Sequence, residues 1–147
     1  MEKEVWVISL GGSRIVPNEV DIEFLQNFKK LIDSNPNKKF IVVTGGGKTS
    51  RTYASAMKKI GKSTGYQSRI GIAVTRFHAE YLMKMFGKSA NHALPKTIKK
   101  TINLLDKNHI VFTGALRYSK EQTSDSVAAK IAAQLGCPFI NLTNIKG

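Results

Sequence analysis

Two glycine clusters, each directly behind an apolar run, are the residues of this sequence best suited to chemistry. Residues 5–10 lead into Gly11-Gly12-Ser13, and residues 40–44 lead into Gly45-Gly46-Gly47-Lys48. Because glycine has no Cβ atom, a bulky anion can closely approach the backbone N–H groups that follow such a strand. A helix that begins just after the loop adds the partial positive charge of its N-terminus. The pattern therefore predicts a site for phosphate groups.

Polar and cationic side chains accompany both clusters. Ser13 closes the first cluster, and Lys48 and Arg51 follow the second at a spacing of about one helical turn. Phosphoryl transfer depends mainly on positioning and on neutralising the transferred group, so glycine amides and cations suffice for it. Neither cluster matches a Walker loop or the Gly-x-Gly-x-x-Gly fingerprint. The alternative interpretation is that both clusters are simple tight turns.

A third polar group, Thr123-Ser124-Asp125-Ser126, opens a predicted helix. One interpretation is a helix N-cap with an acidic residue in the first turn. The other is that hydroxyls and amides face a second phosphate, while Asp125 holds a metal or orients a cation. Arg76 fits either a ligand contact or a surface position, and His78 fits a structural role. We find no His/Cys/Asp cluster at metal-ligand spacing and predict no metal site made by the protein alone.

The elements that must position these groups alternate along the chain. Apolar and β-branched runs predict strands over residues 4–10, 39–44, 109–113 and 138–142. Helical periodicity predicts helices over 21–33, 48–60, 69–86, 95–105 and 123–135. The second of these helices is expected to bury Tyr53, Ala54, Met57 and Ile60. The third has Ile70, Ile72, Val74, Phe77, Tyr81, Leu82 and Phe86 available to bury.

This alternation predicts an α/β fold in which helices cover both faces of a parallel sheet. In such sheets ligands bind beyond the carboxyl ends of the strands. Both glycine clusters, Gly114 and Thr143-Asn144 fall at those ends. We therefore expect them to meet at one edge of the sheet.

Composition limits the class of protein. The chain has 147 residues, 41% of them hydrophobic, which predicts one compact domain over residues 1–147. We expect no membrane span, and the first residues lack a signal-peptide pattern, so the expected location is the cytoplasm. Cys137 is the only cysteine, which excludes intramolecular disulfides and predicts a small buried residue. The net charge of +13 attracts polyanions. The lysines are dispersed, however, which makes nucleic-acid binding the less favoured interpretation.

These residues, in this order, resemble the amino-acid-kinase family, most closely its archaeal-type uridylate (UMP) kinases. The resemblance rests on residues 7–13 with Val16-Pro17, on 42–48 with Arg51, on 70–76 with Ala79, and on 123–129 with Thr143-Asn144. It covers essentially the whole chain, and the Ile-Gly-Ile-x-Val-Thr-Arg stretch is its most specific part. It implies a three-layer αβα sandwich with a mainly parallel sheet. It also implies transfer of the ATP γ-phosphate to a small phosphorylated acceptor, with Mg²⁺, in dimers or hexamers.

The resemblance also assigns roles to residues. It implies ATP-side contacts at Gly11, Gly12, Ser13, Gly47 and Arg51, with Thr143 and Asn144 at the start of the nucleotide-base region. It implies contacts to a UMP-like acceptor at Gly45, Gly46, Gly114, Thr123 and Ser124. Ser13, Lys48 and Asp125 are the expected catalytic residues.

The sequence departs from the family pattern at three places. Ser68 stands where the family has an aspartate that holds the acceptor ribose, and Lys146 replaces another aspartate. A longer, basic segment over 116–125 replaces the family's Pro-Gly-His-Thr-Thr-Asp loop. We also expect the chain to lack the C-terminal ATP-binding lobe, which would leave an exposed edge strand and favour self-association or a partner. The chain is therefore expected to be a UMP-type kinase or, alternatively, a catalytically inactive nucleotide-binding or regulatory homologue.

Overall fold

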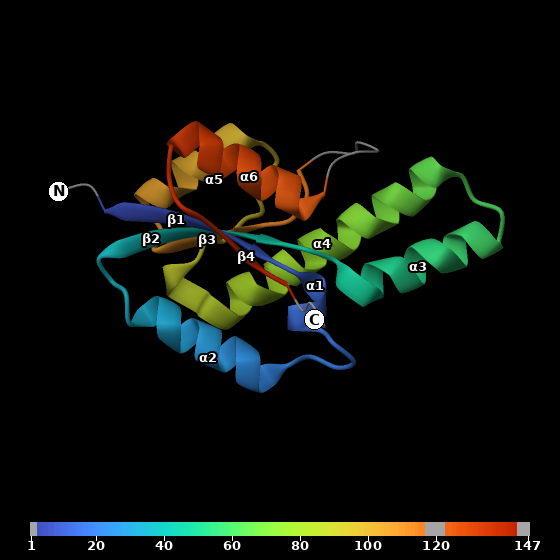
Figure 1. The fold of residues 1–147 in the computed structure, drawn as a ribbon, viewed down its shortest axis with the longest axis horizontal. Coiled ribbons are helices and arrows are strands. Elements are labelled where there is room, and N and C mark those ends of the chain that lie inside the picture. Colours follow the sequence, from blue (N-terminus) through green and yellow to red (C-terminus); the bar gives the residue numbers. More distant parts are fainter. Residues whose placement is uncertain (1–2, 117–122, 144–147) are drawn as a thin grey trace.

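The protein is built on one parallel sheet. The computed structural model describes residues 3–116 and 123–143. Within these residues the strands are β1 (Glu4–Leu10), β2 (Lys38–Thr44), β3 (Ile110–Thr113) and β4 (Phe139–Leu142). They pair in parallel in the order β3-β2-β1-β4 (Figure 1). The predicted parallel α/β architecture is confirmed.

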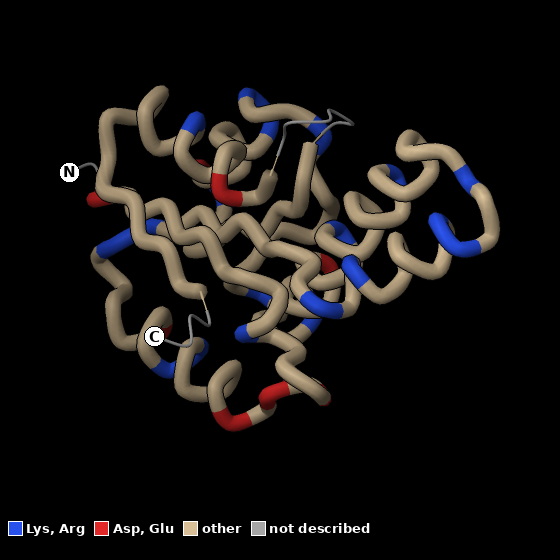
Figure 2. Tube along the Cα trace, turned by 45° about the vertical axis from the view of Figure 1, so that its right-hand side comes forward, with Lys and Arg blue, Asp and Glu red and all other residues tan. Residues whose placement is uncertain are grey.

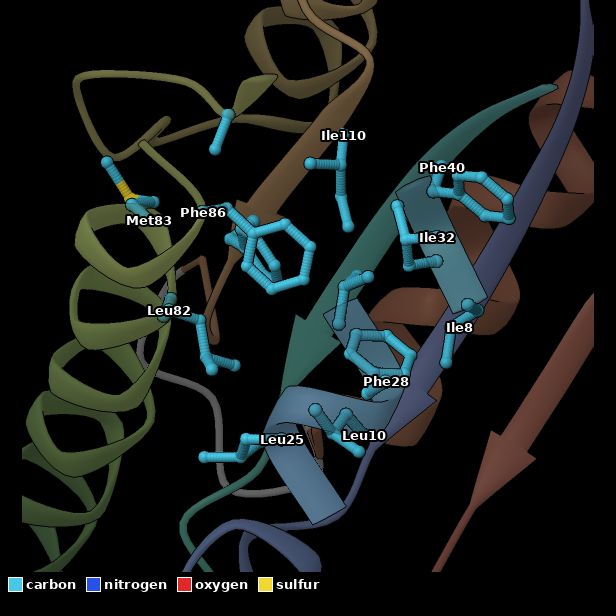
Figure 3. Packing of buried hydrophobic residues seen from close by; sticks show 14 of the residues in the cluster. Ile8, Leu10, Leu25, Phe28, Ile32, Phe40, Leu82, Met83, Phe86 and Ile110 are labelled. Atoms are coloured by element: carbon cyan, nitrogen blue, oxygen red, sulfur yellow. The ribbon is translucent and has the colours of Figure 1, made fainter. Parts of the chain in front are cut away.

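Helices cover both faces of this sheet, which makes the three layers. Alternate residues of a strand point to opposite faces, so Ile8 and Leu10 enter one core while Val7 enters the other. The first core lies under α2 (Ile22–Asp33) and α4 (Thr64–Phe86). Figure 3 shows its packing, with side chains of α2 and α4 meeting those of the strands. The second core lies under α5 (Ile98–Asn103) and α6 (Ser124–Leu135).

Local signals in the sequence set most of the helix ends. The Asp21 side chain accepts a hydrogen bond of 3.0 Å from the Phe24 amide and caps α2, as predicted. Gly61, Gly87 and Gly136 adopt positive φ angles where the helices before them end. Two short elements had no clear sequence signal, namely α1 (Gly12–Ile15) and the first turns of α4, which Ser63 caps. Two 3-10 turns, η1 (Gly87–Ser89) and η2 (Leu104–Asp106), complete the described elements.

One helical hairpin projects from the body of the protein. It is formed by α3 (Gly47–Lys59) and the first half of α4 (Figure 1). No residue of α3 is buried, and the exposed fraction of Tyr53 is 58%. The prediction that Tyr53 and Ile60 face inward is therefore wrong, because α3 packs mainly along α4 and, at its start, against α1, rather than over the sheet.

The buried face of α4 also differs from the prediction. Thr75, His78, Ala79, Leu82, Met83 and Phe86 are buried, whereas Phe77 and Tyr81 are 65% and 41% exposed. Helical periodicity shows that a helix has an apolar stripe, but docking against the sheet selected a neighbouring stripe. Leu82 and Phe86 were predicted correctly.

Strand β4 forms an open edge of the sheet. Among the strands that the structure describes it pairs with β1 alone, and Phe139 and Ile140 are 40% and 36% exposed. This confirms the expected exposed edge strand. Cys137, just before β4, is half-buried beside the second core, and burial raises the pKa of its thiol. Among the described residues, no helix has the length and apolarity needed to cross a membrane.

Candidate functional site

The predicted site residues meet at the carboxyl ends of β1, β2 and β4. The Gly45 amide donates to the Leu10 carbonyl oxygen at 2.8 Å, and the Gly11 amide donates to the Leu142 carbonyl oxygen at 2.9 Å. The first glycine of each cluster therefore continues the sheet. Strand β1 has its neighbours β2 and β4 on opposite sides, so the site lies where the strand order reverses, which is a common ligand position.

The next glycines bring the two loops into direct backbone contact. A Cβ atom at Gly12 would lie 2.3 Å from the carbonyl carbon of Gly46, and one at Gly47 would lie 2.5 Å from the Ser13 nitrogen. Gly47 also has a φ of +58°, which side chains rarely adopt. These positions require glycine because the loops cross with no space between them. The two clusters therefore pack together as one unit.

Two helices begin at this contact and direct their N-termini toward it. Helix α3 begins at Gly47, and α6 begins at Ser124, whose hydroxyl oxygen would lie 3.1 Å from a Cβ atom at Gly45. Within the described residues, the amides of Gly12 and Ser13 have no backbone acceptor, as expected for a first helical turn. Free amides and helix N-termini together make this edge of the sheet favourable for anions.

Cationic side chains border the site on one side. Lys48 and Arg51 are exposed on the first turns of α3. Together they line a shallow groove of about 450 Å³, whose other walls are Thr52, Ser55, Ala56 and Lys59. Lys48 also lines a second groove of about 240 Å³ that reaches Val16, Pro17 and Tyr53. The predicted proximity of the second glycine cluster and the two cations is thus present.

Asp125 and Thr123 take different positions at the start of α6. The Asp125 carboxylate accepts a hydrogen bond from the hydroxyl of Ser9, a buried residue of β1 that sequence reasoning missed. Thr123 is the N-cap, because its hydroxyl accepts a 3.1 Å hydrogen bond from the Ser126 amide. The N-cap interpretation is confirmed for Thr123, while the hydrogen bond to Ser9 fixes Asp125 at the end of β1.

Buried polar residues hold the loops in place, and no local pattern in the sequence predicts most of them. The ring Nδ1 of His78 lies 2.8 Å from the Gly45 carbonyl oxygen, which confirms the predicted structural role of His78. The Thr44 hydroxyl donates to the Thr75 carbonyl oxygen at 2.7 Å. In turn the Thr75 hydroxyl accepts from the Ala115 amide at 2.9 Å. These bonds join residues distant in sequence, so only the folded chain shows them.

Arg76 and Gly114 pack next to the site. The Arg76 guanidinium donates to the carbonyl oxygens of Ala115 and Pro95, each at 3.1 Å, so it ties two loops together. A Cβ atom at Gly114 would lie 2.7 Å from the backbone nitrogen of Arg76, which explains the glycine there. The alternative that Arg76 is a plain surface residue is therefore wrong.

The remaining predicted residues lie at the margins. Thr143 lies beside Gly11, with its Cα 3.6 Å from a Cβ atom placed there, while Asn144 and Lys146 lie outside the described residues. So does most of the basic segment that follows Leu116. Ser68 is half-buried on α4. Among residues 3–116 and 123–143, no group of three or more His, Cys, Asp or Glu side chains could hold a metal ion.

Comparison with known proteins decides which family this arrangement represents. The model of the amino acid kinase family matches residues 4–147. The chain belongs to the amino acid kinase family. Among curated members, the uridylate kinase of Thermoplasma volcanium is 36% identical over 142 residues. That alignment covers 96% of this chain and 61% of the relative. The present chain thus spans about three fifths of the length of the curated relatives that it matches.

Solved structures agree with this assignment. The crystal structure of uridylate kinase from Archaeoglobus fulgidus superposes with a TM-score of 0.83 at 33% identity, covering 97% of this chain and 64% of that one. A substrate complex of an isopentenyl phosphate kinase superposes with a TM-score of 0.69 at 17% identity, which shows a common fold alone. The three-layer αβα sandwich of the amino acid kinase family is therefore confirmed.

Proposed function

We propose that this chain forms the acceptor-binding part of a UMP-kinase-type phosphotransferase. The observation that carries the proposal is the backbone contact of Gly12 with Gly46 and Gly47, where the N-terminus of α3 also lies. Such an arrangement concentrates amide donors and helix dipoles on phosphate oxygens. The similarity to archaeal uridylate kinases supports a nucleoside monophosphate, UMP in particular, as the acceptor.

The two loops suit two phosphates. We assign the acceptor phosphate to the side of Gly45 and Gly46, with Gly114, Thr123 and Ser124 next to the rest of the acceptor. We assign the ATP phosphates to the side of Gly11, Gly12, Ser13, Gly47 and Arg51, with Thr143 and Asn144 toward the base. The close contact between the loops fits in-line transfer, because it would bring the two anions together.

Charge neutralisation falls to Lys48 and Arg51. The first turn of α3 contains Lys48 and no acidic residue, although cations near a helix N-terminus oppose the helix dipole. A lysine in this position therefore does not stabilise the helix, but it is well placed to bind an anion. In the transfer, an oxygen of the acceptor phosphate bonds to the γ-phosphorus while the bond to the β–γ bridging oxygen breaks, and ADP leaves. Ser13 would donate to the moving phosphoryl group, and Asp125 would orient the donors.

Mg²⁺ would enter with the nucleotide. The described residues offer no metal cluster, and the Asp125 carboxylate already accepts from Ser9. Mg²⁺ requires no such cluster, because it is usually bound by one or two carboxylates together with substrate phosphates and water. We assign to this chain the binding, orientation and charge neutralisation of phosphates only.

A second candidate function is nucleotide binding without turnover. It is favoured by Ser68, which stands where the kinases that this chain resembles have the aspartate that holds the acceptor ribose. An inactive homologue of this kind would bind UMP, UTP or ATP and transmit that binding to a partner.

Calorimetry and a coupled assay distinguish the two functions. We expect UMP to bind, and Lys48→Ala to weaken its binding by about 10- to 100-fold, because a hydrogen bond to a charged group contributes about 1.5–3 kcal/mol. Lys29→Ala, on α2, is the control and should leave binding unchanged. Turnover of UMP with Mg-ATP, by this chain or a longer gene product, supports the kinase, and binding without turnover supports the second function. No binding of UMP, UTP or ATP would refute both.

A further inference from the structure

The outer face of α3 carries a strip of positive charge that extends beyond the nucleotide site. Lys48, Arg51 and Lys59 line one side of this helix together, in the groove of about 450 Å³. Their spacing of three and eight residues places them on one face over about 16 Å. Lys58 lies about 100° around the helix from Lys59, and Lys62 follows the end of α3, so both add charge near the tip of the hairpin without lining the groove. These five cations are called the α3 strip below.

No acidic residue balances this charge locally. The sequence contains no Asp or Glu between Asp33 and Glu80, a segment that includes the entire α3 helix and most of α4. In Figure 2 the charged residues in the distal part of the hairpin are accordingly all Lys or Arg. All five cations of the strip are exposed, and their charged groups form no hydrogen bond or ion pair within the described residues. The strip is thus an uncompensated surface rather than part of a surface ion-pair network.

The composition of the strip indicates which kind of polyanion it fits. The groove has Thr52, Ser55 and Ala56 between its cations, which are hydroxyl-bearing or small, so the groove itself offers no large apolar side chain for insertion into a bilayer. Ile60 is exposed just beyond the end of the groove. Hydroxyl groups and lysines are common phosphate contacts in nucleic-acid complexes. The Tyr53 ring is 58% exposed and lines the adjacent groove with Lys48 and Thr52. An exposed ring next to a line of cations provides a surface on which a base can stack.

We propose that the α3 strip binds single-stranded nucleic acid. The backbone phosphates would lie along Lys48, Arg51, Lys58, Lys59 and Lys62, and a base would stack on Tyr53. A second copy of this chain is a poorer occupant of the strip, because two such faces would repel each other. The strip shares Lys48 and Arg51 with the nucleotide site, whereas Lys58, Lys59 and Lys62 have no part in the chemistry proposed for the glycine loops.

Fluorescence anisotropy with a labelled oligouridylate tests the proposal, and the matching oligothymidylate shows whether ribose matters. We expect the logarithm of the binding constant to fall with the logarithm of salt concentration at a slope of about −2 to −4, since up to five phosphates are contacted. The triple variant Lys58→Glu, Lys59→Glu, Lys62→Glu should lower affinity by about tenfold or more and flatten the slope by about 2.

A matched control separates this strip from the net charge of the protein. The triple variant Lys96→Glu, Lys100→Glu, Lys107→Glu changes the charge equally, at a separate groove next to α5. It should bind the oligonucleotide within about twofold of the unchanged protein if the strip is the site. Because Lys58 and Lys59 occupy the last turn of α3, where cations favour the helix, a Lys→Gln triple provides the test if the glutamate variant fails to fold.

Tyr53→Ala tests the stacking step, with the exposed Tyr81→Ala on α4 as its control. We expect about a fivefold or greater loss of affinity for the first and none for the second. Four results would overturn the proposal. The first two are no binding of either oligonucleotide and equal losses of affinity in both triple variants. The other two are binding to phosphatidylserine vesicles alone, and a strip variant that keeps its affinity but has a lower mass by light scattering, which would indicate an interface between copies of the chain. Equal affinities of the two oligonucleotides would support a site that reads phosphates and bases without using the 2′-hydroxyl.

Discussion

The substitution Gly12→Ala tests whether contact between the two glycine loops builds the nucleotide site. A Cβ atom at this position would lie 2.3 Å from the Gly46 carbonyl carbon and 2.4 Å from the Gly47 nitrogen. Both are backbone atoms, which cannot rotate away as a side chain can. Gly12 does not have a positive φ, so alanine adds no backbone strain, and its effect comes from the steric clash alone.

The size of the effect follows from these distances. Real Cβ contacts are essentially never under 3.0 Å, so the loops must separate by about 1 Å. A displacement of this size can lower the rate of a reaction that depends on positioning by about 100-fold. Overpacking of this kind costs about 1–3 kcal/mol, and each kcal/mol lowers the Tm of a chain of this size by about 2–4 °C. We therefore expect a folded variant with a reduced Tm and UMP binding at least about tenfold weaker.

Gly136→Ala is the matched control. Gly136 has a φ of +62° and open space around the position of a Cβ atom, so alanine costs stability through the left-handed backbone, by about 1–2 kcal/mol. It ends α6 at the opposite end of that helix from Ser124. Thermal unfolding and calorimetry with UMP should show a lowered Tm in both variants and weakened binding only in Gly12→Ala. A folded Gly12→Ala protein that binds UMP normally would refute the reasoning.

Two further predictions concern stability and reactivity. Thr75→Val removes the acceptor of the Ala115 amide and should lower the free energy of unfolding by about 1–3 kcal/mol in denaturant titrations, whereas Thr52→Val on the exposed face of α3 should change it by less than about 0.5 kcal/mol. An unchanged Thr75→Val would contradict the role given to this bond. Burial raises the pKa of the Cys137 thiol, so iodoacetamide should modify the folded chain more slowly than the denatured chain at mildly alkaline pH. The same shift stabilises the fold below the ordinary thiol pKa, and this contribution disappears as the pH rises through the raised pKa. Equal alkylation rates in the two states would contradict the shift.

Most of the fold could be predicted from local patterns. Strands, helices and their parallel arrangement follow from apolar runs, periodicity and glycine stops, because each of these signals acts within a few neighbouring residues. Burial of whole faces was harder to predict. Tyr53 and Phe77 belong to helical stripes that look apolar in sequence, yet both are exposed. Helix α3 packs mainly against α4 rather than over the sheet, and α4 turns a different face to the sheet.

For the candidate site, local patterns in the sequence were enough to predict that glycine loops follow buried strands and that Lys48, Arg51 and Asp125 are near helix starts. These are short-range facts of composition and order. The folded chain was needed to show that Gly11 and Gly45 extend the sheet while Gly12 and Gly47 make the contact. It also paired Ser9 with Asp125 and His78 with Gly45. It gathered lysines that look scattered in sequence onto one face of α3. The physical reason is that contacts across the sheet and between helices depend on packing direction, which no local pattern encodes.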